Sequence, residues 1–326
     1  MKTCLITGIN GFIGSNLAKR LIEEGHKVKG LIRKSSDLKF LSGMDIELHY
    51  GDITDLDSVI EASKGCDRIF HVAALASDWG HYDKFYRINV DGTLNVAQAA
   101  VANKVDRMVY ISTVAMYGFG RTNVKEEDSK PITGFAYNDT KKIAEDKVFE
   151  FAKNNNLNIT ALKPGNVYGI NDHTFIEKYL DALVSGKVAY VAGGKSKTCP
   201  VYIENLLDAV MLASEKDEAV GETFFVTDGL DITWKEFTEK LAEEMGLKKP
   251  KQSFPFGLAF AIGSILEFIY KSIGSKTPPL ITRYRVSNGG LDYTFSIDKA
   301  KKLLGYNPRI ELATAIKRSV AWYKNR

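Results

Sequence analysis

Cysteine is scarce in this 326-residue sequence, and no apolar leader segment stands at its start. The three cysteines, Cys4, Cys66 and Cys199, are odd in number and form no C-x-x-C pair. Their pattern excludes a disulfide framework and a thiolate metal site, and it predicts reduced cysteines in the core. Because the opening KTCLITG reaches a glycine loop before an apolar segment can form, we expect no signal peptide and a cytoplasmic location.

A large excess of either charge is also absent. The chain has 44 lysines and arginines against 40 acidic residues, and no basic stripe is interleaved with aromatic residues. This balance speaks against a nucleic-acid partner. Repeats and low-complexity tracts are missing too, and a composition of 44% hydrophobic and 26% charged residues is typical of a globular protein with a full core.

What the sequence does contain is a regular alternation of apolar strands and amphipathic helices. Strand patterns occupy residues 3–8, 26–33, 46–52, 67–74, 107–113 and 158–164, separated by helical patterns such as 14–24, 55–62 and 89–102. This alternation predicts an α/β fold with a doubly wound parallel sheet, the Rossmann fold. The pattern breaks after residue 165. We therefore expect a cofactor domain over 1–165, completed by parts of 199–226, and a smaller C-terminal α/β substrate domain over 166–198 and 227–326.

The stretch TGINGFIGSNL places three glycines, Gly8, Gly11 and Gly14, between the first strand and the first helix. Glycines at such a junction let the backbone approach a pyrophosphate, and the helix N-terminus stabilises its charge. A purely structural turn is the alternative. The strand before and the helix after favour a dinucleotide site.

The end of the second strand indicates which dinucleotide is bound. An acidic residue there would accept the ribose hydroxyls of NAD, but LIRKSSD has Ile32 at that place, followed by Arg33 and Lys34. Two cations suit a 2′-phosphate, so we predict NADP, with NAD still open and solvated loop charges as the alternative. Asp52 in YGDIT is either an acceptor for the adenine or a strand-end cap.

The segments YNDTK and ISTVAMYG hold the candidate chemistry. Tyr137 and Lys141 are four residues apart, so on a helix they share one face. A tyrosine is a poor acid or base near neutral pH unless a cation stabilises its phenolate. Lys141, together with a positive nicotinamide ring, would supply that field.

These motifs occur in the order found in the extended short-chain dehydrogenase/reductases, the NAD-dependent epimerase/dehydratase superfamily, which the chain resembles over essentially its whole length. The other matching segments are NVDGT, KPGNVYG, VYIENLLDAV and FSIDKAKKLLGYNPRIEL. The resemblance selects Thr113 over Ser112 as the active-site hydroxyl, and it implies that Asn89 fixes backbone or a water, or caps a helix. It also implies a set of cofactor contacts: Gly8, Gly11, Phe12, Ile13, Gly14, Arg33, Lys34, Asp52, Ile53, Ala73, Ala74, Tyr137, Lys141, Pro164 and Val167.

Departures from the family pattern narrow the choice among the branches of the family. Dehydratases carry an acidic pair where this chain has Val114–Ala115, so water elimination has no obvious acid and base. Sugar epimerases usually place an arginine before the VYIEN segment, and here Cys199 and Pro200 stand there, with Lys195 and Lys197 as nearby point charges.

The uncharged run 252–266 resembles the 3β-hydroxysteroid dehydrogenase and dihydroflavonol-reductase-like branch. It falls short of the ~20 apolar residues that span a bilayer. A lid over the substrate, a membrane-surface anchor and a buried core helix are the three interpretations, and we favour the lid over the anchor.

The resemblance therefore implies an NAD(P)-dependent oxidoreductase that interconverts a secondary alcohol and a ketone on an apolar, steroid-, long-chain- or flavonoid-like substrate. Tyr137 would exchange the proton, Lys141 would lower the tyrosine pKa and hold the ribose, and Thr113 would bind the substrate oxygen. The alternatives are a nucleotide-sugar epimerase with tightly bound NAD and a non-catalytic NADP-sensing protein. A homodimer through the helices at 89–102 and 137–153 and a weak membrane-surface contact are further expectations.

Overall fold

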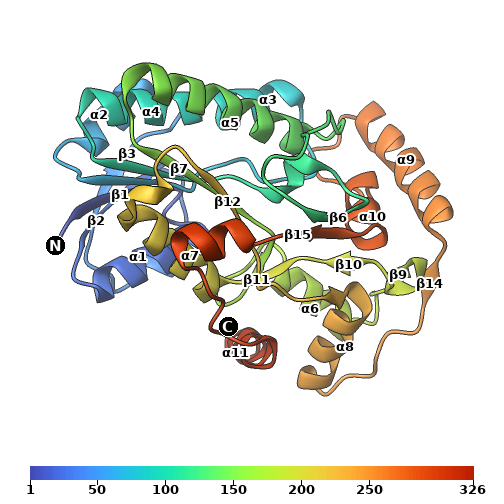
Figure 1. The fold of residues 1–326 in the computed structure, drawn as a ribbon. Coiled ribbons are helices and arrows are strands. Elements are labelled where there is room, and N and C mark those ends of the chain that lie inside the picture. Colours follow the sequence, from blue (N-terminus) through green and yellow to red (C-terminus); the bar gives the residue numbers. More distant parts are fainter.

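A computed structural model describes all residues, 1–326, and its centre is a seven-stranded parallel sheet (Figure 1). The strands run in the order β12-β7-β5-β4-β1-β2-β3, and every neighbouring pair is parallel. Their bounds are β1 Thr3–Thr7, β2 Lys27–Ile32, β3 Ile46–Tyr50, β4 Arg68–His71, β5 Arg107–Ile111, β7 Ile159–Pro164 and β12 Thr223–Val226. The chain winds outward in both directions from β1 and β4, which is the Rossmann topology, and the predicted fold class is confirmed.

Both faces of the sheet are covered by helices because successive strand residues point to opposite sides and both sets are apolar. Ile6 and Phe70 belong to the core on the face of α1 (Phe12–Glu23) and α7 (Ile203–Glu215). Their neighbours Leu5 and Ile69 belong to the core on the other face. The helices of that face are α2 (Leu56–Ser63), α4 (Gly92–Ala102) and α5 (Ala136–Asn155).

Beyond β7 the regular alternation ends, as the sequence predicts, and every strand except β12 belongs to a short pair. The pairs are β8 (Asn166–Tyr168) with β11 (Pro200–Tyr202), β9 (Tyr190–Val191) with β14 (Ser253–Phe254), β10 (Lys197–Thr198) with β13 (Ile232–Thr233), and β15 (Tyr293–Phe295) with β6 (Arg121–Val124). From the late part of the chain, α7 packs on the central sheet and β12 extends it beside β7. The division into a cofactor and a substrate domain stays a prediction.

The remaining helical elements surround these pairs and the sheet edges. They are α3 Tyr82–Tyr86, α6 Ile176–Val184, α8 Trp234–Met245, α9 Phe256–Ser272, α10 Arg283–Gly290 and α11 Leu312–Lys324, with short 3₁₀ or π segments η1 Lys39–Leu41, η2 Arg87–Asp91, η3 Val114–Tyr117, η4 Ala192–Gly194, η5 Asp217–Ala219 and η6 Ala300–Leu304.

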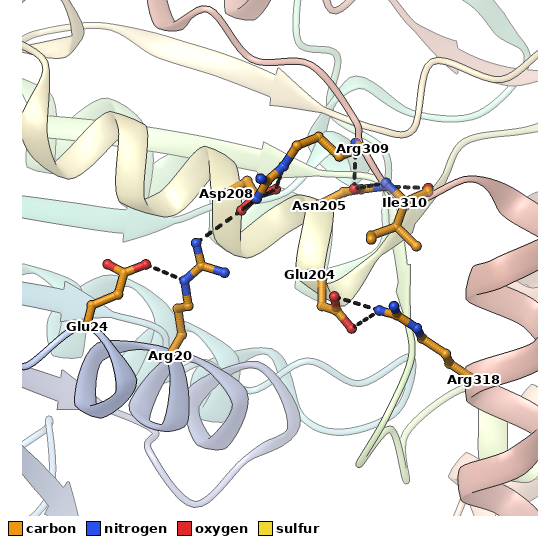
Figure 2. A network of polar contacts seen from close by, with 8 residues as sticks. All are labelled: Arg20, Glu24, Glu204, Asn205, Asp208, Arg309, Ile310 and Arg318. Atoms are coloured by element: carbon orange, nitrogen blue, oxygen red, sulfur yellow. Dashed lines mark hydrogen bonds and ion pairs between the residues drawn. The ribbon is translucent and has the colours of Figure 1, made fainter.

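A polar network ties the C-terminal segment to α7 (Figure 2). Asp208 accepts hydrogen bonds of 2.6–2.9 Å from the Arg309 guanidinium, and its carboxylate also faces Arg20 of α1. The Asn205 side-chain oxygen accepts the backbone N–H groups of residues 309 and 310 at 3.0 and 2.9 Å. The segments VYIENLLDAV and GYNPRIEL, which carried part of the resemblance, are therefore held together by their own polar residues.

Helix α9 is not a buried core helix, so that interpretation of the apolar run is wrong. Only Ala259, Gly263 and Glu267 of this helix are buried, and they pack toward α10. Its exposed large residues are Leu258, Ile262, Ile265, Phe268 and Ile269. None of the helices in the structure combines the length and apolar content needed to cross a bilayer.

The three cysteines are free and buried, as predicted. Burial raises the pKa of Cys4 and Cys199 to about 12 and that of Cys66 to about 11. The thiols are therefore protonated at neutral pH and act as core residues.

Candidate active site

The glycine loop brings backbone, rather than side chains, to the carboxyl edge of the sheet. Gly8 has φ +72°, and a Cβ there would lie 2.8 Å from the backbone of Ala73. A Cβ on Gly14 would lie 2.2 Å from the carbonyl oxygen of Gly8, so α1 can start this close to the loop only with glycine. Gly11 precedes α1 and has no side chain to cap it, and the first turn carries no acidic residue. Backbone N–H groups of this turn are thus open to an anion.

A pocket of about 480 Å³ opens over this loop, at the point where the strand order reverses. Ten of the predicted cofactor residues line it together: Gly8, Gly11, Phe12, Ile13, Gly14, Arg33, Asp52, Ile53, Ala73 and Ala74. The glycine cradle, the uncapped helix start and the apolar walls fit a dinucleotide. His173 and Thr174 also line the pocket from beyond residue 165. Sequence reasoning missed both, because no local pattern marks a loop that folds back onto the sheet.

The two cations after β2 are placed differently. Arg33 lines the pocket, and its guanidinium is in no ion pair. Lys34 is outside the lining set, and both side chains are exposed. The contacts of Arg33 and Lys34 with the cofactor stay predictions.

Asp52 takes the capping role, and its contact with the adenine stays a prediction. Its Oδ1 accepts hydrogen bonds of 2.9 Å from the N–H and the hydroxyl of Thr54, which caps the end of β3. Because a carboxylate has two oxygens, Oδ2 remains available to a ligand in the pocket.

Thr113 and Tyr137 meet at the end of β5. Thr113 begins η3 and accepts the Ala115 N–H at 3.1 Å, and its side chain lies near enough to Tyr137, in the first turn of α5, to affect the pKa of the phenol. Burial raises the pKa of Tyr137, and the nearby Thr113 side chain opposes that shift. In the chain by itself the phenol is therefore protonated at neutral pH, and the lowering expected from Lys141 with the nicotinamide ring stays a prediction.

Lys141 lies one turn along the same face of α5 and is almost fully buried. Its ammonium group donates a 2.9 Å hydrogen bond to the Ile111 carbonyl and lies 4.1 Å from the centre of the Tyr110 ring. Burial lowers the pKa of Lys141 to about 7, and the Glu145 carboxylate opposes this shift. A lysine at this pKa changes charge near neutral pH, which is typical of functional sites.

Pro164 and Val167 are outside the lining of the large pocket. The Ser112 N–H donates to the Leu162 carbonyl at 2.7 Å, so the end of β7 with Pro164 lies beside the strand end that carries Thr113. Val167 is in β8 and pairs with Val201. Their predicted contacts with the nicotinamide are untested.

Asn89 fixes backbone. Its side chain exchanges hydrogen bonds with the N–H and the carbonyl of Leu75, at 2.7 and 3.3 Å, and donates to Thr140 of α5 at 3.1 Å. It is inside the π-helical turn η2 and does not cap a helix. Asn89 thereby joins the loop after β4 to the helix that carries Tyr137.

Aromatic side chains from distant segments gather beside Tyr137. Phe135, two residues before it, packs 5.2 Å from Tyr284 of α10 and 6.0 Å from Phe119, measured between ring centres. Tyr293 of β15 lies 4.9 Å from Phe119. Burial raises the pKa of Tyr284, and the neighbouring Tyr137 raises it further. Tyr284 and Tyr293 thus join Phe119 and Phe135 in an aromatic wall next to the candidate proton donor.

Comparisons with known proteins agree with this geometry. The model of the NAD dependent epimerase/dehydratase family matches residues 4–226. A ketoreductase of Stigmatella aurantiaca, named for 4-hydroxy-2-methyl-3-oxo-4-farnesyl-3,4-dihydroquinoline-1-oxide, is 30% identical over 94% of this chain and 92% of its own. The 3-beta-hydroxysteroid dehydrogenase of Mycolicibacterium neoaurum is 28% identical over 98% of this chain and 90% of its own.

The same topology occurs in solved structures. UDP-glucose 4-epimerase from Thermotoga maritima superposes with a TM-score of 0.80 over 99% of both chains at 22% identity, a likeness that concerns the fold. The family match covers the glycine loop, Thr113, Tyr137 and Lys141 and ends at the last strand of the central sheet. On these grounds the chain belongs to the NAD dependent epimerase/dehydratase family.

Proposed function

We propose that the protein is an NADP-preferring oxidoreductase that interconverts a secondary alcohol and a ketone on an apolar substrate. The observation that carries this proposal is the contact of Thr113 with Tyr137, with Lys141 one turn beyond, at the carboxyl end of β5 and so on the same edge of the sheet as the dinucleotide pocket. A non-catalytic NADP-binding protein would not need these three side chains together. The relatives' names describe reductase and dehydrogenase reactions, in agreement with the predicted enzyme class.

In the reduction, Thr113 donates a hydrogen bond to the ketone oxygen and Tyr137 gives that oxygen a proton. The bound nicotinamide would supply the hydride. Tyr137 suits the donor role because burial keeps its phenol protonated at neutral pH. Lys141 would hold the cofactor ribose through its ammonium group and stabilise the phenolate that remains after proton transfer. Asn89 keeps the loop after β4 in place against α5.

Three observations support an apolar substrate. Phe119, Phe135 and Tyr284 present aromatic surface next to Tyr137. The segment before Val201 has no arginine to hold a sugar diphosphate. The ketoreductase relative is named for a farnesyl-bearing substrate. An epimerase with tightly bound NAD is the second candidate.

Thermal shift with NADP present distinguishes the two candidates. Sterols, long-chain ketones or flavonoid-like ketones are expected to raise Tm, because ligands that bind only the native state stabilise it. UDP-sugars are expected to leave Tm unchanged. Stabilisation by UDP-sugars alone would establish the epimerase instead.

The cofactor preference is tested by Arg33→Asp. We expect this change to weaken NADP binding by roughly ten- to a hundred-fold and to improve NAD binding, since a charge-assisted phosphate contact contributes about 1.5–3 kcal/mol. The matched control is Lys34→Asp, which makes the same charge change outside the pocket lining. Fluorescence titration with both cofactors gives the ratio. An unchanged NADP/NAD ratio in Arg33→Asp would place its guanidinium in solvent.

We also infer a weak contact of α9 with an anionic lipid surface. The only acidic residue of this helix, Glu267, is buried and bonded to Arg283. The exposed face is therefore apolar apart from Ser272 and Lys271, and exposed lysines at 248, 249 and 251 precede the helix. Exposed apolar residues next to cations fit the boundary of an anionic bilayer. A lid over the substrate, which the sequence favoured, is the alternative.

Co-sedimentation with anionic liposomes tests this contact. Salt-sensitive pelleting is expected, and Ile265→Ser with Phe268→Ser should abolish it, because these two side chains are 60% and 73% exposed. Val184→Ser, at an exposed residue of α6, is the control and should pellet like the unchanged protein. Absence of pelleting would favour the lid. Phe256 and Phe260 are unsuitable positions because their rings are half-buried and stack on each other.

We also propose a homodimer through α4 and α5. We further propose a cytoplasmic location. Three buried free thiols suit a reducing compartment. Light scattering at several protein concentrations measures the oligomeric state.

A further inference from the structure

A buried carboxylate lies one turn beyond Lys141 on α5, and the reaction as described does not use it. Glu145 is 2% exposed, and its Oε1 lies 2.9 Å from the Nζ atoms of both Lys163 and Lys130. Its Oε2 accepts a 2.7 Å hydrogen bond from the Ser112 hydroxyl. Burying such a group costs desolvation free energy, and packing a helix on a sheet does not require it.

Three side chains on one face of α5 reach three successive residues at the end of β5. The contacts are Tyr137 with Thr113, Lys141 with the carbonyl of Ile111, and Glu145 with Ser112. The spacing of four residues makes them neighbours along the helix. Through its hydrogen bond with Ser112, Glu145 therefore holds the residue that directly precedes Thr113.

Lys163 completes the arrangement from β7. Its ammonium group donates 3.0 Å hydrogen bonds to the hydroxyls of Tyr117 and Thr223 in addition to its ion pair with Glu145. Its aliphatic and charged atoms are 1% exposed. All of its donors are thus directed at partners inside the protein, and it holds the Glu145 carboxylate in one orientation.

The charges around Lys141 are few. On its own helix Glu145 is the carboxylate that favours its charged form, and burial opposes that form. From β4 and β5, His71 and Tyr110 face it, and burial lowers the pKa of His71 to about 3, so that ring is neutral. Around Glu145 the charged groups are Lys130 and Lys163, with Asp146 paired to Lys130 and Glu126 near Lys163. Burial alone would raise the pKa of Glu145, but the two lysines bring it below its ordinary value.

We propose that Glu145 is a positioning residue for the reaction: it fixes the end of β5 that carries Thr113, and it holds a negative charge one turn along the helix from the ammonium group of Lys141. This inference rests on the proposed function, in which Lys141 must be charged to hold the ribose and to stabilise the Tyr137 phenolate. A merely structural ion pair would hold the fold together without affecting the charge of Lys141.

The charge of Glu145 is tested by the pH dependence of NADPH binding, measured by fluorescence without substrate. In the unchanged protein the affinity should fall as the pH rises through the pKa of Lys141. In Glu145→Gln, which removes the negative charge and keeps Lys130 and Lys163, the fall should occur at least one pH unit lower. Glu150→Gln, at an exposed position of the same helix, is the matched control and should leave the profile unchanged.

The positioning role is tested by Ser112→Ala, which removes the hydrogen bond to β5 and keeps the ion pairs. We expect kcat to fall at least tenfold while the KM for NADPH and its pH profile stay as they are. Superimposable pH profiles in folded Glu145→Gln, together with unchanged kcat in Ser112→Ala, would overturn the inference. If Glu145→Gln does not fold, the double variant Glu145→Gln with Lys163→Met, which leaves no unpaired Lys163, replaces it, and a smaller shift in the same direction is expected. Unchanged kcat in Ser112→Ala would then overturn the inference. Absence of ketone turnover in the unchanged protein would instead contradict the proposed function. The pH profiles of NADPH binding would still measure how Glu145 affects the charge of Lys141.

Discussion

Replacing Tyr137 with phenylalanine is expected to lower kcat for ketone reduction by about 10²- to 10⁴-fold, the range that general acid catalysis contributes. This corresponds to about 3–5 kcal/mol of lost transition-state stabilisation. The change removes only the hydroxyl that meets Thr113 and leaves the ring in place. NADP affinity should therefore stay within a few-fold, and steady-state kinetics together with cofactor titration measure both quantities.

The control for this variant is Tyr168→Phe. The Tyr168 hydroxyl is also buried but has no hydrogen-bond partner, so its removal deletes the same atom without breaking a contact. We expect its kcat and Tm to match those of the unchanged protein. Retention of more than a tenth of kcat in Tyr137→Phe would contradict the role of this residue as acid and base.

The pH dependence of the two reaction directions follows from the same residue. Because burial raises the pKa of Tyr137, the neutral phenol is abundant at neutral pH and the phenolate is rare. Ketone reduction needs the neutral form as proton donor, and alcohol oxidation needs the phenolate as acceptor. The protonation state of this side chain thus favours reduction at neutral pH and oxidation at higher pH.

The features that were predictable from the sequence are those fixed by local spacing. The strand-loop-helix pattern around Gly8 and Gly14 predicted the cradle, and the interval from Tyr137 to Lys141 predicted a shared helix face. Both patterns involve residues that lie only a few positions apart in the sequence. Six strands of the sheet followed from the alternation of elements, since each crossover must return to the same sheet. The seventh, β12, was not identified as a strand.

The features that sequence reasoning missed depend on contacts between distant segments. Glu145 and Ser112 are 33 positions apart, and Lys163 comes from another strand, so no motif joins them. The aromatic wall likewise combines Phe135 with Tyr284 across the two parts of the chain.

The apolar run before residue 266 shows a different limit. Composition indicated that these side chains avoid water, but a run of apolar letters does not say which face of a helix has a partner. The structure gives α9 a narrow contact face of small residues around Gly263 and leaves the larger side chains outside. Burial depends on what the fold brings opposite each residue, and one stretch of sequence does not contain that information.

Gly14→Ala is expected to reduce NADP affinity at least tenfold and to lower Tm by several degrees. The added methyl group would lie 2.2 Å from the Gly8 carbonyl oxygen and 2.8 Å from the Ile9 Cα, and both are backbone atoms that cannot rotate away. Helix α1 would have to move off the loop, and overpacking of this kind costs about 1–3 kcal/mol. The same movement would withdraw the first-turn N–H groups from the pyrophosphate.

Two further glycines make this prediction specific. Gly257→Ala places the same methyl group in the first turn of α9, where no atom lies within 4 Å, and it should leave affinity and Tm unchanged or slightly raised. Gly11→Ala is intermediate, because its methyl group would lie 3.3 Å from the Gly8 oxygen, and it should reduce affinity less than Gly14→Ala does. Cofactor titration and thermal unfolding of the three variants give the ranking. Equal NADP affinity in all three would mean that the close approach of α1 to the loop is not what holds the dinucleotide.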